Sequence, residues 1–444
     1  MNFRITISTS ILCLVCSHFL LAEPTVKDSW HQWRGPHNNG VAEGDAPTNF
    51  SATDKVKWKI AIPGKGNSTP VVWGDVIYLT TAIAQDTPQG GAPQPAGRSG
   101  RGPGGGAGAL VDTDFVLMAL DKNSGKVLWR KTAVTLTPHE GYHRRYGSFA
   151  SNSPVTDGET LIASFGSRGV FGFDMDGNLK WKKDLGPLQM RLAFGEGVAP
   201  VLHDKYLIIQ NDHEGQSYIV VLDKNNGEEL WRAQRDEHSS WPQPIVVDYD
   251  GRKQLVTSSA RVRSYDLATG ELIWEAGGLG ANAIPAVINV DNEMVIAMTG
   301  YRDPNLLAIK LGGEGDLTDN PEYVKWTNDR GNSYSASPVL HDGILYFVTD
   351  RGMVNAFDAK TGEKFYHQQR LPQTYTFKAS PVAANGKLYL ATEEGDVIVL
   401  KLGKTYEVLA TNKMGDEMFI SSPIIVGGDL YLRSQDELFC ISSD

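Results

Sequence analysis

ALDKNSGKVLW, at residues 119–129, is the stretch that decides the fold, because similar stretches return along the chain. They are VLDKNNGEELW at 221–231, SYDLATGELIW at 264–274, AFDAKTGEKFY at 356–366 and the shorter GFDMDGNLKW at 172–181. Each combines an Asp, a turn, a Gly and a closing aromatic residue. The Asp can accept hydrogen bonds from turn N–H groups, the Gly can take positive φ, and the aromatic ring can cover a seam between units. The recurrence predicts a repeat architecture.

A second recurring feature is a proline that opens an apolar strand. It occurs eight times, at Pro70, Pro154, Pro200, Pro244, Pro285, Pro338, Pro381 and Pro423. Most successive prolines lie 41 to 46 residues apart, and a period of about 43 residues is that of a four-stranded propeller blade. Each unit is expected to run strand A, a tight turn, strand B, a variable loop, strand C, the Asp–Gly turn and strand D.

The last unit, from Pro423 to Ser443, contains strands A to C but no strand D. The missing strand occurs near the start of the chain, where TDKVKWKIA at 53–61 carries Trp58 shortly before the first proline. We therefore predict an all-β, eight-bladed β-propeller of four-stranded antiparallel blades over residues 53–444, with the last blade closed by this N-terminal strand. The tryptophans predicted to dock at the seams are Trp58, Trp129, Trp181, Trp231, Trp274 and Trp326.

Three segments lie outside the repeat. Residues 1–22 combine Arg4, an apolar stretch and Ala22, and they are predicted to be an export signal, with an uncleaved anchor as the alternative. Residues 23–52 form an N-terminal segment, and residues 84–112 form a Gly/Pro-rich loop insertion in the first blade. The predicted location is periplasmic or extracellular, with no transmembrane helix in the mature chain.

Charge and cysteine content limit the partners. The chain has 52 Asp and Glu against 42 Lys and Arg, a net charge of −10, which argues against binding to nucleic acid or anionic lipid because both favour a basic face. Cys13 and Cys16 lie inside the predicted signal, so Cys440 is the cysteine of the mature chain and an intramolecular disulfide is excluded.

The repeat A-x-D-x-x-T-G-x-x-x-W resembles the tryptophan-docking motif of the pyrroloquinoline-quinone (PQQ) propellers, and the likeness covers residues 53–443. That family includes quinoprotein alcohol dehydrogenases and BamB-type lipoproteins, which assist outer-membrane-protein assembly. WHQWRGPHNNG, at 30–40, is similar to the start of exported PQQ-like propellers of the planctomycete type. The resemblance implies the ring, whereas a shared blade leaves the chemistry open.

The chain also departs from both branches of that family. The dehydrogenases clamp their quinone with a disulfide of adjacent cysteines, and this sequence has no such pair. BamB-type proteins carry a lipidated cysteine, whereas neither Cys13 nor Cys16 follows a small residue as lipid attachment requires.

The D-to-A and B-to-C loops share one face of the predicted ring, and their length and variety make it the expected functional face. On it, HEGYH at 139–143 matches H-E-x-x-H, but Pro138 and Gly141 disfavour the helix that a zinc site would need. If PQQ and calcium bind, the resemblance implies Trp241 as a stacking residue, with channel plugging as the alternative. Further candidates are Arg191 and Arg261 for the cofactor, Glu196 and Asn282 for the metal, and Asp303 as catalytic base.

The function predicted first is that of a non-catalytic platform that binds a protein or another ligand on this face. The alternative is a PQQ-dependent dehydrogenase that oxidises an alcohol or sugar, with a carboxylate removing the proton. Binding of a polymer or glycan is a third possibility.

Overall fold

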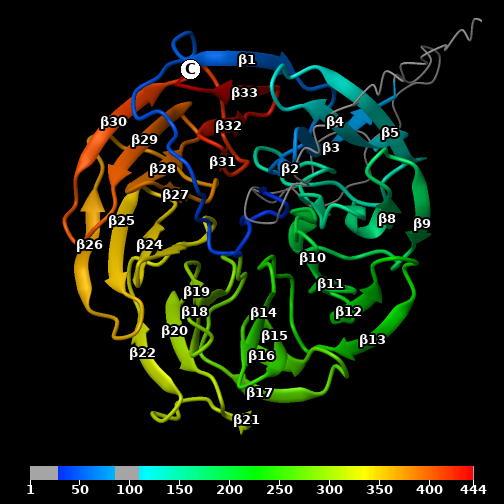
Figure 1. Cartoon of the computed structure of the whole chain (residues 1–444). Helices are drawn as coiled ribbons and strands as arrows, with labels where there is room; N and C mark the ends of the chain where they lie inside the picture. Colours follow the sequence, from blue (N-terminus) through cyan, green and yellow to red (C-terminus); the bar gives the residue numbers. More distant parts are fainter. Residues whose placement is uncertain (1–28, 86–109, 444) are drawn as a thin grey trace, which may run out of the picture.

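Eight β-sheets stand around a ring in the computed structural model, which describes residues 29–85 and 110–443 (Figure 1). The predicted eight-bladed propeller is thereby confirmed. The predicted signal at 1–22 and most of the insertion at 84–112 lie outside the described residues. The two described helical segments are single 3₁₀ turns, η2 (Gly166–Arg168) and η3 (Arg191–Ala193), and neither is long and apolar enough to cross a membrane.

The blades follow one another in chain order, each with strand A innermost. Blade 1 comprises β2 (Val71–Trp73), β3 (Val76–Ala84), β4 (Thr113–Asp121) and β5 (Val127–Leu136). Blade 2 comprises β6 (Val155–Thr156), β7 (Leu161–Ser164), β8 (Val170–Phe173) and β9 (Leu179–Lys183), and blade 3 comprises β10 (Val201–His203), β11 (Tyr206–Asn211), β12 (Tyr218–Asp223) and β13 (Glu229–Gln234). Blade 4 comprises β14 (Ile245–Tyr249), β15 (Arg252–Ser258), β16 (Val262–Asp266) and β17 (Leu272–Ala276).

Blade 5 comprises β18 (Ile288–Val290), β19 (Met294–Thr299), β20 (Asn305–Lys310) and β22 (Val324–Asn328). Blade 6 comprises β23 (Val339–His341), β24 (Ile344–Val348), β25 (Met353–Asp358) and β26 (Lys364–Arg370), and blade 7 comprises β27 (Val382–Ala384), β28 (Lys387–Ala391), β29 (Asp396–Lys401) and β30 (Val408–Lys413). Blade 8 comprises β31 (Ile424–Val426), β32 (Asp429–Arg433), β33 (Glu437–Ile441) and β1 (Val56–Ala61). A two-residue strand, β21 (Gly315–Asp316), adds to blade 4 parallel to β17.

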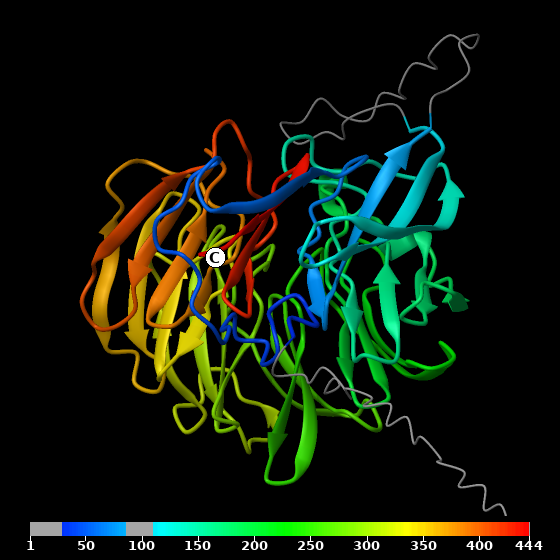
Figure 2. The same ribbon diagram turned by 45° about the horizontal axis from the view of Figure 1, so that its top comes forward.

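The ring closes through β1, as the sequence predicts. This strand pairs antiparallel with β33, with Trp58 opposite Cys440, and Figure 2 shows the two strands side by side. The buried Arg433 joins the closing blade to blade 1, because its guanidinium donates to the carbonyl oxygens of Ser68 and Thr80 at 2.8 and 3.0 Å. Chain ends more than 350 residues apart are thus held together by sheet pairing and by a buried side chain.

Four of the repeat tryptophans make the same contact with the following blade. The indole N–H groups of Trp58, Trp181, Trp231 and Trp326 donate to the carbonyl oxygens of Lys122, Lys224, Leu267 and Ala359 at 2.9 to 3.1 Å. Each acceptor follows the Asp of the next repeat. At the first seam Gly125 has φ +70°, and a Cβ there would lie 2.6 Å from Trp58 Cε3. The Gly of the repeat therefore gives the turn its conformation and leaves space for the ring of the preceding blade.

Trp274 differs from these four. It is fully buried, and its indole N–H donates to Gln254 Oε1 at 3.2 Å within its own blade. Blade 5 has no Asp–Gly turn to receive it, because the segment 311–323 connects β20 to β22 and contributes β21 to blade 4.

Hydroxyl groups link the inner strands of several neighbouring blades. The backbone N–H groups of Ser337, Ser380, Ser422 and Thr69 donate to the hydroxyls of Ser380, Ser422, Thr69 and Ser153 at 2.8 to 3.1 Å. All five residues directly precede a repeat proline. The equivalent residues of blades 3 to 5, Ala199, Gln243 and Ile284, carry no hydroxyl.

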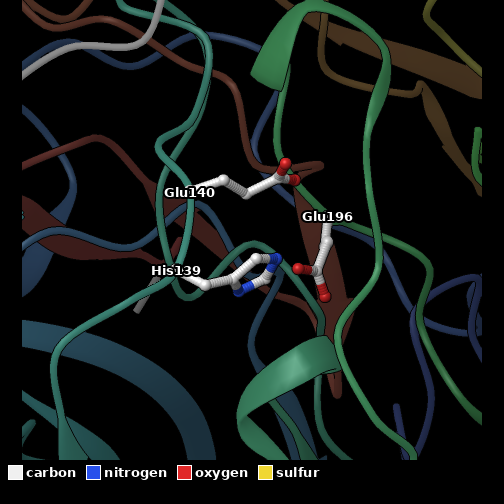
Figure 3. Close-up of side chains that lie close together, drawn as sticks. All are labelled: His139, Glu140 and Glu196. Atoms are coloured by element: carbon white, nitrogen blue, oxygen red, sulfur yellow. The ribbon is translucent and has the colours of Figure 1, made fainter. Parts of the chain in front are cut away.

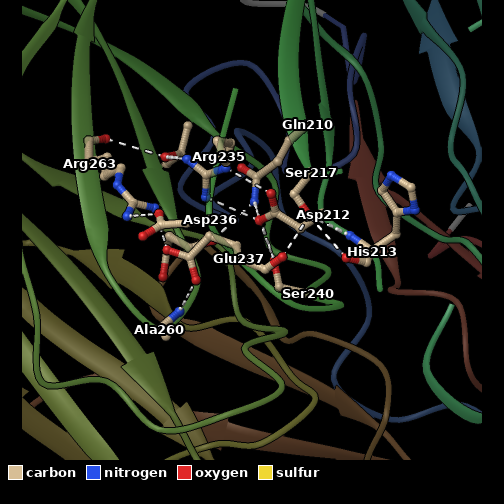
Figure 4. Close-up of polar contacts among 12 residues, drawn as sticks. Gln210, Asp212, His213, Ser217, Arg235, Asp236, Glu237, Ser240, Ala260 and Arg263 are labelled. Atoms are coloured by element: carbon tan, nitrogen blue, oxygen red, sulfur yellow. Dashed lines mark hydrogen bonds and ion pairs between the residues drawn. The ribbon is translucent and has the colours of Figure 1, made fainter. Parts of the chain in front are cut away.

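A buried ionic network connects blades 3 and 4 instead (Figure 4). Arg235 Nε donates to Asp212 Oδ1 at 2.7 Å, and Arg235 Nη1 donates to Thr257 Oγ1 of the next blade at 2.7 Å. Burial alone lowers the pKa of Arg235, but Asp212, Tyr265 and Glu237 together more than offset this and raise it. Both side chains of the pair are fully buried, and their mutual hydrogen bonds supply the pairing that a charge in a core requires.

Residues 29–52 pack against the ring. Trp30 exchanges two backbone hydrogen bonds with Val72 of blade 1, at 3.0 and 2.9 Å, and Ala42 N donates to Ala383 O of blade 7 at 2.8 Å. The buried Arg34 donates to the carbonyl oxygens of Pro338 and Pro381 at 2.9 and 3.0 Å. Burial lowers the pKa of Arg34 to about 9, so it stays cationic at neutral pH. The segment runs near the centre of the ring (Figure 1) and ties blade 1 to blades 6 and 7.

Candidate functional site

A cavity of about 320 Å³ lies at the centre of the ring. Its described lining residues come from D-to-A loops, except Trp33, which the N-terminal segment supplies. Five of them directly precede a repeat proline: Thr69, Ser153, Ala199, Ile284 and Ser422. Six are aromatic: Trp33, His143, Tyr146, Phe194, Trp241 and Tyr334. A mainly apolar cavity with a few placed polar groups is the usual form of a small-molecule site.

The HEGYH segment divides its side chains between two places. His139 makes a hydrogen bond through Nε2 with Leu188 O at 2.8 Å, beside blade 2. His143 lines the cavity, where its ring stacks on Tyr146 with centroids 4.7 Å apart. Burial and Lys378 lower the pKa of His143, so it is neutral at pH 7. The described segment is irregular, and the two histidines therefore do not share the helix face that a zinc-protease motif requires.

His139, Glu140 and Glu196 bring their ligand atoms within 4.8 Å of one another (Figure 3). Glu196 is already committed within the protein: Oε1 accepts from Arg168 Nη1 at 2.6 Å and from Ser167 Oγ at 2.7 Å, and Oε2 accepts from Ser167 N at 2.6 Å. Gly166 makes this contact feasible, because a Cβ there would lie 1.6 Å from Glu196 Oε2. A cation at Glu196 would compete with Arg168 and Ser167 for its two oxygens.

Lys378 is paired in a similar way. Its ammonium group donates to Asp350 Oδ2, lies 4.0 Å from Glu393 Oε1 and stands 4.7 Å from the ring centre of Tyr146. Arg145 Nη2 approaches Glu393 Oε2 at 3.0 Å. Burial raises the pKa of Glu393, with Lys378 and Arg145 opposing that rise. The charges at this wall of the cavity thus balance within the protein.

The structure separates the candidates for a PQQ and calcium site. Trp241 and Glu196 line the cavity, and Trp241 Nε1 donates to Gly195 O at 2.9 Å. Asn282 is buried and does not line the cavity. Arg191 and Asp303 do not line the cavity, and Asp303 is exposed between β19 and β20.

Arg261 also lies away from the cavity, because it pairs with Glu275 at 2.9 Å and with Asp316 at 3.1 Å beside β17 and β21. The proposed metal ligands therefore do not form one open oxygen cage: Glu196 is paired with Arg168, and neither Asn282 nor Asp303 lines the cavity. These residues do not fit calcium as they stand.

Sequence reasoning missed Trp33, Asn67 and Tyr146 as lining residues. The residues before the repeat prolines could have been predicted to line the cavity. They occupy the same position in every blade, and such a position is repeated around the ring axis. Trp33 could not have been predicted in this way, since it lies outside the repeat.

The sequence matches the family described as outer membrane protein assembly factor BamB, over residues 44–185, 113–368 and 314–444. A comparison with curated protein sequences finds no match.

Solved structures with a similar fold include BamB from Moraxella catarrhalis, at 14% identity and a TM-score of 0.51, over 74% of this chain and 93% of that one. The quinohemoprotein alcohol dehydrogenase from Comamonas testosteroni has 11% identity and a TM-score of 0.60, over 95% and 82%. A europium-containing methanol dehydrogenase has 11% identity and a TM-score of 0.61, over 91% and 89%. At such identities the likeness shows the fold alone.

Proposed function

The chain belongs to the family of the outer membrane protein assembly factor BamB, and from that premise we propose that it is an exported, non-catalytic binding propeller. Its ligand or protein partner docks on the face of the D-to-A loops, centred on the cavity. Export to the periplasm or beyond rests on the pattern of residues 1–22 and on the family.

The observation that carries this proposal is the pairing of the charged groups at the cavity. Glu196 is neutralised by Arg168 and Lys378 by Asp350. A general base needs a free acceptor, and a metal needs several free oxygen ligands. Neither is offered by the charged side chains that line this cavity in the described chain, whereas its aromatic walls provide contact area for binding.

A PQQ-dependent dehydrogenase is the second candidate, and one observation favours it. Trp241 and Glu196, expected from different loops as stacking residue and metal ligand, line the same cavity. A quinone bound there would supply the electron acceptor, and Trp241 would provide a flat surface for it. The pairing of Glu196 with Arg168 weighs against the metal that such a site needs.

The test is reconstitution with PQQ and calcium, followed by calorimetry and by a dye-linked assay with alcohols and sugars. We expect neither stoichiometric PQQ binding nor substrate-dependent dye reduction. Both together would overturn the proposal.

The variant Arg168→Met tests the reason for that expectation. It frees Glu196, so terbium luminescence excited through tryptophan should increase relative to the unaltered protein. Arg130→Met, which removes an exposed arginine of β5 that pairs with no carboxylate among the described residues, is the matched control and should leave the signal unchanged. Strong terbium binding by the unaltered protein would contradict the argument from pairing.

A further inference from the structure

We propose that the central cavity binds a neutral sugar ring, either as a free saccharide or as the end of a glycan chain. The inference rests on the proposed binding function and names the class of ligand. Three properties of the cavity carry it: the balance of its charges, the two indole rings of Trp33 and Trp241, and its polar groups. The Trp33 ring has the guanidinium carbon of Arg34 5.9 Å from its centre, and neither indole has an aromatic partner among the described residues.

The charge balance favours a ligand without charge. Glu196 is held by Arg168 and by two donors from Ser167, and the donors of Lys378 point to Asp350, Ser335 and the ring of Tyr146. A carboxylate or ammonium group entering the cavity would meet no free counter-charge at these residues. Burying it would be unfavourable, because an unpaired charge in a low-dielectric site loses its hydration without compensation.

The walls offer two flat apolar surfaces. Trp33 belongs to the N-terminal segment, and Trp241 belongs to the loop before β14. Neither indole contacts another aromatic ring within residues 29–85 and 110–443. The rings of Tyr146 and Tyr334, by contrast, already stack on His143 and Tyr301. The hydrogen bond from Trp241 Nε1 to Gly195 O fixes its indole in place. A ligand with a flat C–H face can pack on such a ring with little loss of side-chain entropy.

The polar groups exclude a purely hydrocarbon ligand. Asn67 donates through Nδ2 to Tyr146 O at 2.7 Å, and its Oδ1 accepts no hydrogen bond from the described residues. The Ser151 hydroxyl donates to Ser148 O at 3.1 Å and lies 2.9 Å from Ser148 Oγ, so it can accept one further hydrogen bond. Covering them with hydrocarbon would remove water without replacing its hydrogen bonds. A sugar has an apolar ring face and a rim of hydroxyls, and so satisfies both kinds of surface.

The volume suits one sugar ring. At roughly 30 Å³ for each water molecule, the cavity of about 320 Å³ holds about ten waters, which a single sugar ring can largely displace. Trp33 of the N-terminal segment lines this cavity together with the D-to-A loops. A glycan would therefore place one residue, its terminal one, in the cavity.

The experiment measures binding of methyl glycosides and neutral disaccharides by calorimetry and tryptophan fluorescence, beside glucuronate and glucosamine as charged counterparts. We expect at least one neutral saccharide to bind with a Kd of about 1 mM or lower, and its charged counterpart to bind about tenfold more weakly. No binding of any neutral saccharide at about 10 mM, or tighter binding of a charged one, would overturn the inference.

Variants locate the site. Trp33→Leu and Trp241→Leu should each weaken saccharide binding about tenfold, and Trp241→Phe should restore part of the loss because it keeps a flat ring. Trp73→Leu is the matched control, since Trp73 packs on His31 and Gly158 away from the cavity. Melting curves establish that each variant is folded. Unchanged affinity in both cavity variants, or an equal loss in the control, would place the ligand elsewhere.

Two further comparisons distinguish a free saccharide from a glycan end, and a sugar from other ligands. Tighter binding of an oligosaccharide than of its terminal methyl glycoside identifies a glycan end as the ligand, and equal binding identifies a free saccharide. Binding of adenosine or uridine without any saccharide would refute the sugar while leaving the binding platform intact. Turnover with PQQ and calcium would instead refute the platform itself.

Discussion

Replacement of Gly125 by alanine tests why the chain repeats one turn and one tryptophan. In the structure Gly125 has φ +70°, and an added Cβ would lie 2.6 Å from Trp58 Cε3 and 2.8 Å from Trp58 Cδ2. Gly343 is the matched control, because it has φ +74° and nothing lies within 4 Å of the same added atom. The two substitutions share the backbone strain and differ in the contact with tryptophan.

The expected magnitudes follow from these two terms. An alanine at positive φ costs about 1–2 kcal/mol, which is the whole effect expected for Gly343→Ala. In Gly125→Ala the indole must also move by about 1 Å to regain the normal carbon contact of 3.5–4.0 Å. That movement adds about 1–3 kcal/mol of overpacking and about 1 kcal/mol from the hydrogen bond to Lys122 O. We expect a loss of about 3–6 kcal/mol for Gly125→Ala, well beyond the control.

The assay is equilibrium unfolding in urea, with the double variant Gly125→Ala/Trp58→Ala to complete a thermodynamic cycle. Removing the indole eliminates the clash, so the double variant should lose clearly less stability than the sum of the two single variants. Equal losses for Gly125→Ala and Gly343→Ala, or strict additivity in the cycle, would show that this seam does not depend on the fit between tryptophan and glycine.

Three further predictions concern other parts of the chain. Burial lowers the pKa of His31 from 6.5 to about 4, so as the pH falls the unfolded chain binds a proton before the folded chain does. The neutral, buried imidazole therefore contributes about 3 kcal/mol of stability that is complete above pH 6.5 and is lost as the pH falls to about 4. As the pH is lowered through this range, the urea midpoint of His31→Gln should fall less steeply than that of the unaltered protein. Equal slopes for the two proteins would show that His31 does not cause this pH dependence. Arg168→Met should cost about 3–5 kcal/mol of unfolding free energy because it leaves Glu196 buried and unpaired, and adding Glu196→Gln should recover part of the loss; a double variant no more stable than the single one would count against the pair. Replacing residues 86–109 by a short Gly-Ser linker should leave the melting temperature nearly unchanged, since loop length has little effect on stability, and a large decrease would show that the segment packs.

The sequence was sufficient to predict the ring because its determinants are local and recur. An Asp and a Gly shape the C–D turns of blades 1 to 4 and 6 locally, and a proline marks the start of each strand A. The fourth strand of the last blade was also predictable, since one unit lacked it and Trp58 stood where the repeat required it. Trp274 shows the limit of such reasoning: its letters match the repeat, but the following blade lacks the turn that would receive it.

The candidate site depended on contacts that no local pattern encodes. Trp241 and Glu196 could be placed on the correct face from loop order, whereas Asp303 and Arg261 share that order and lie away from the cavity. Trp33 reaches the cavity only because Arg34 and Trp30 fasten the N-terminal segment across the ring. Whether Glu196 is free or paired depends on Arg168, 28 residues away.

Each backbone turn and each strand is determined by a few consecutive residues. The sequence alone therefore determined the propeller and its closure. The charge state and the accessibility of a side chain depend on neighbours that only the closed ring brings together. The tertiary structure therefore decided which loop residues meet at the cavity, which charges are already balanced, and which aromatic surfaces remain available to a ligand.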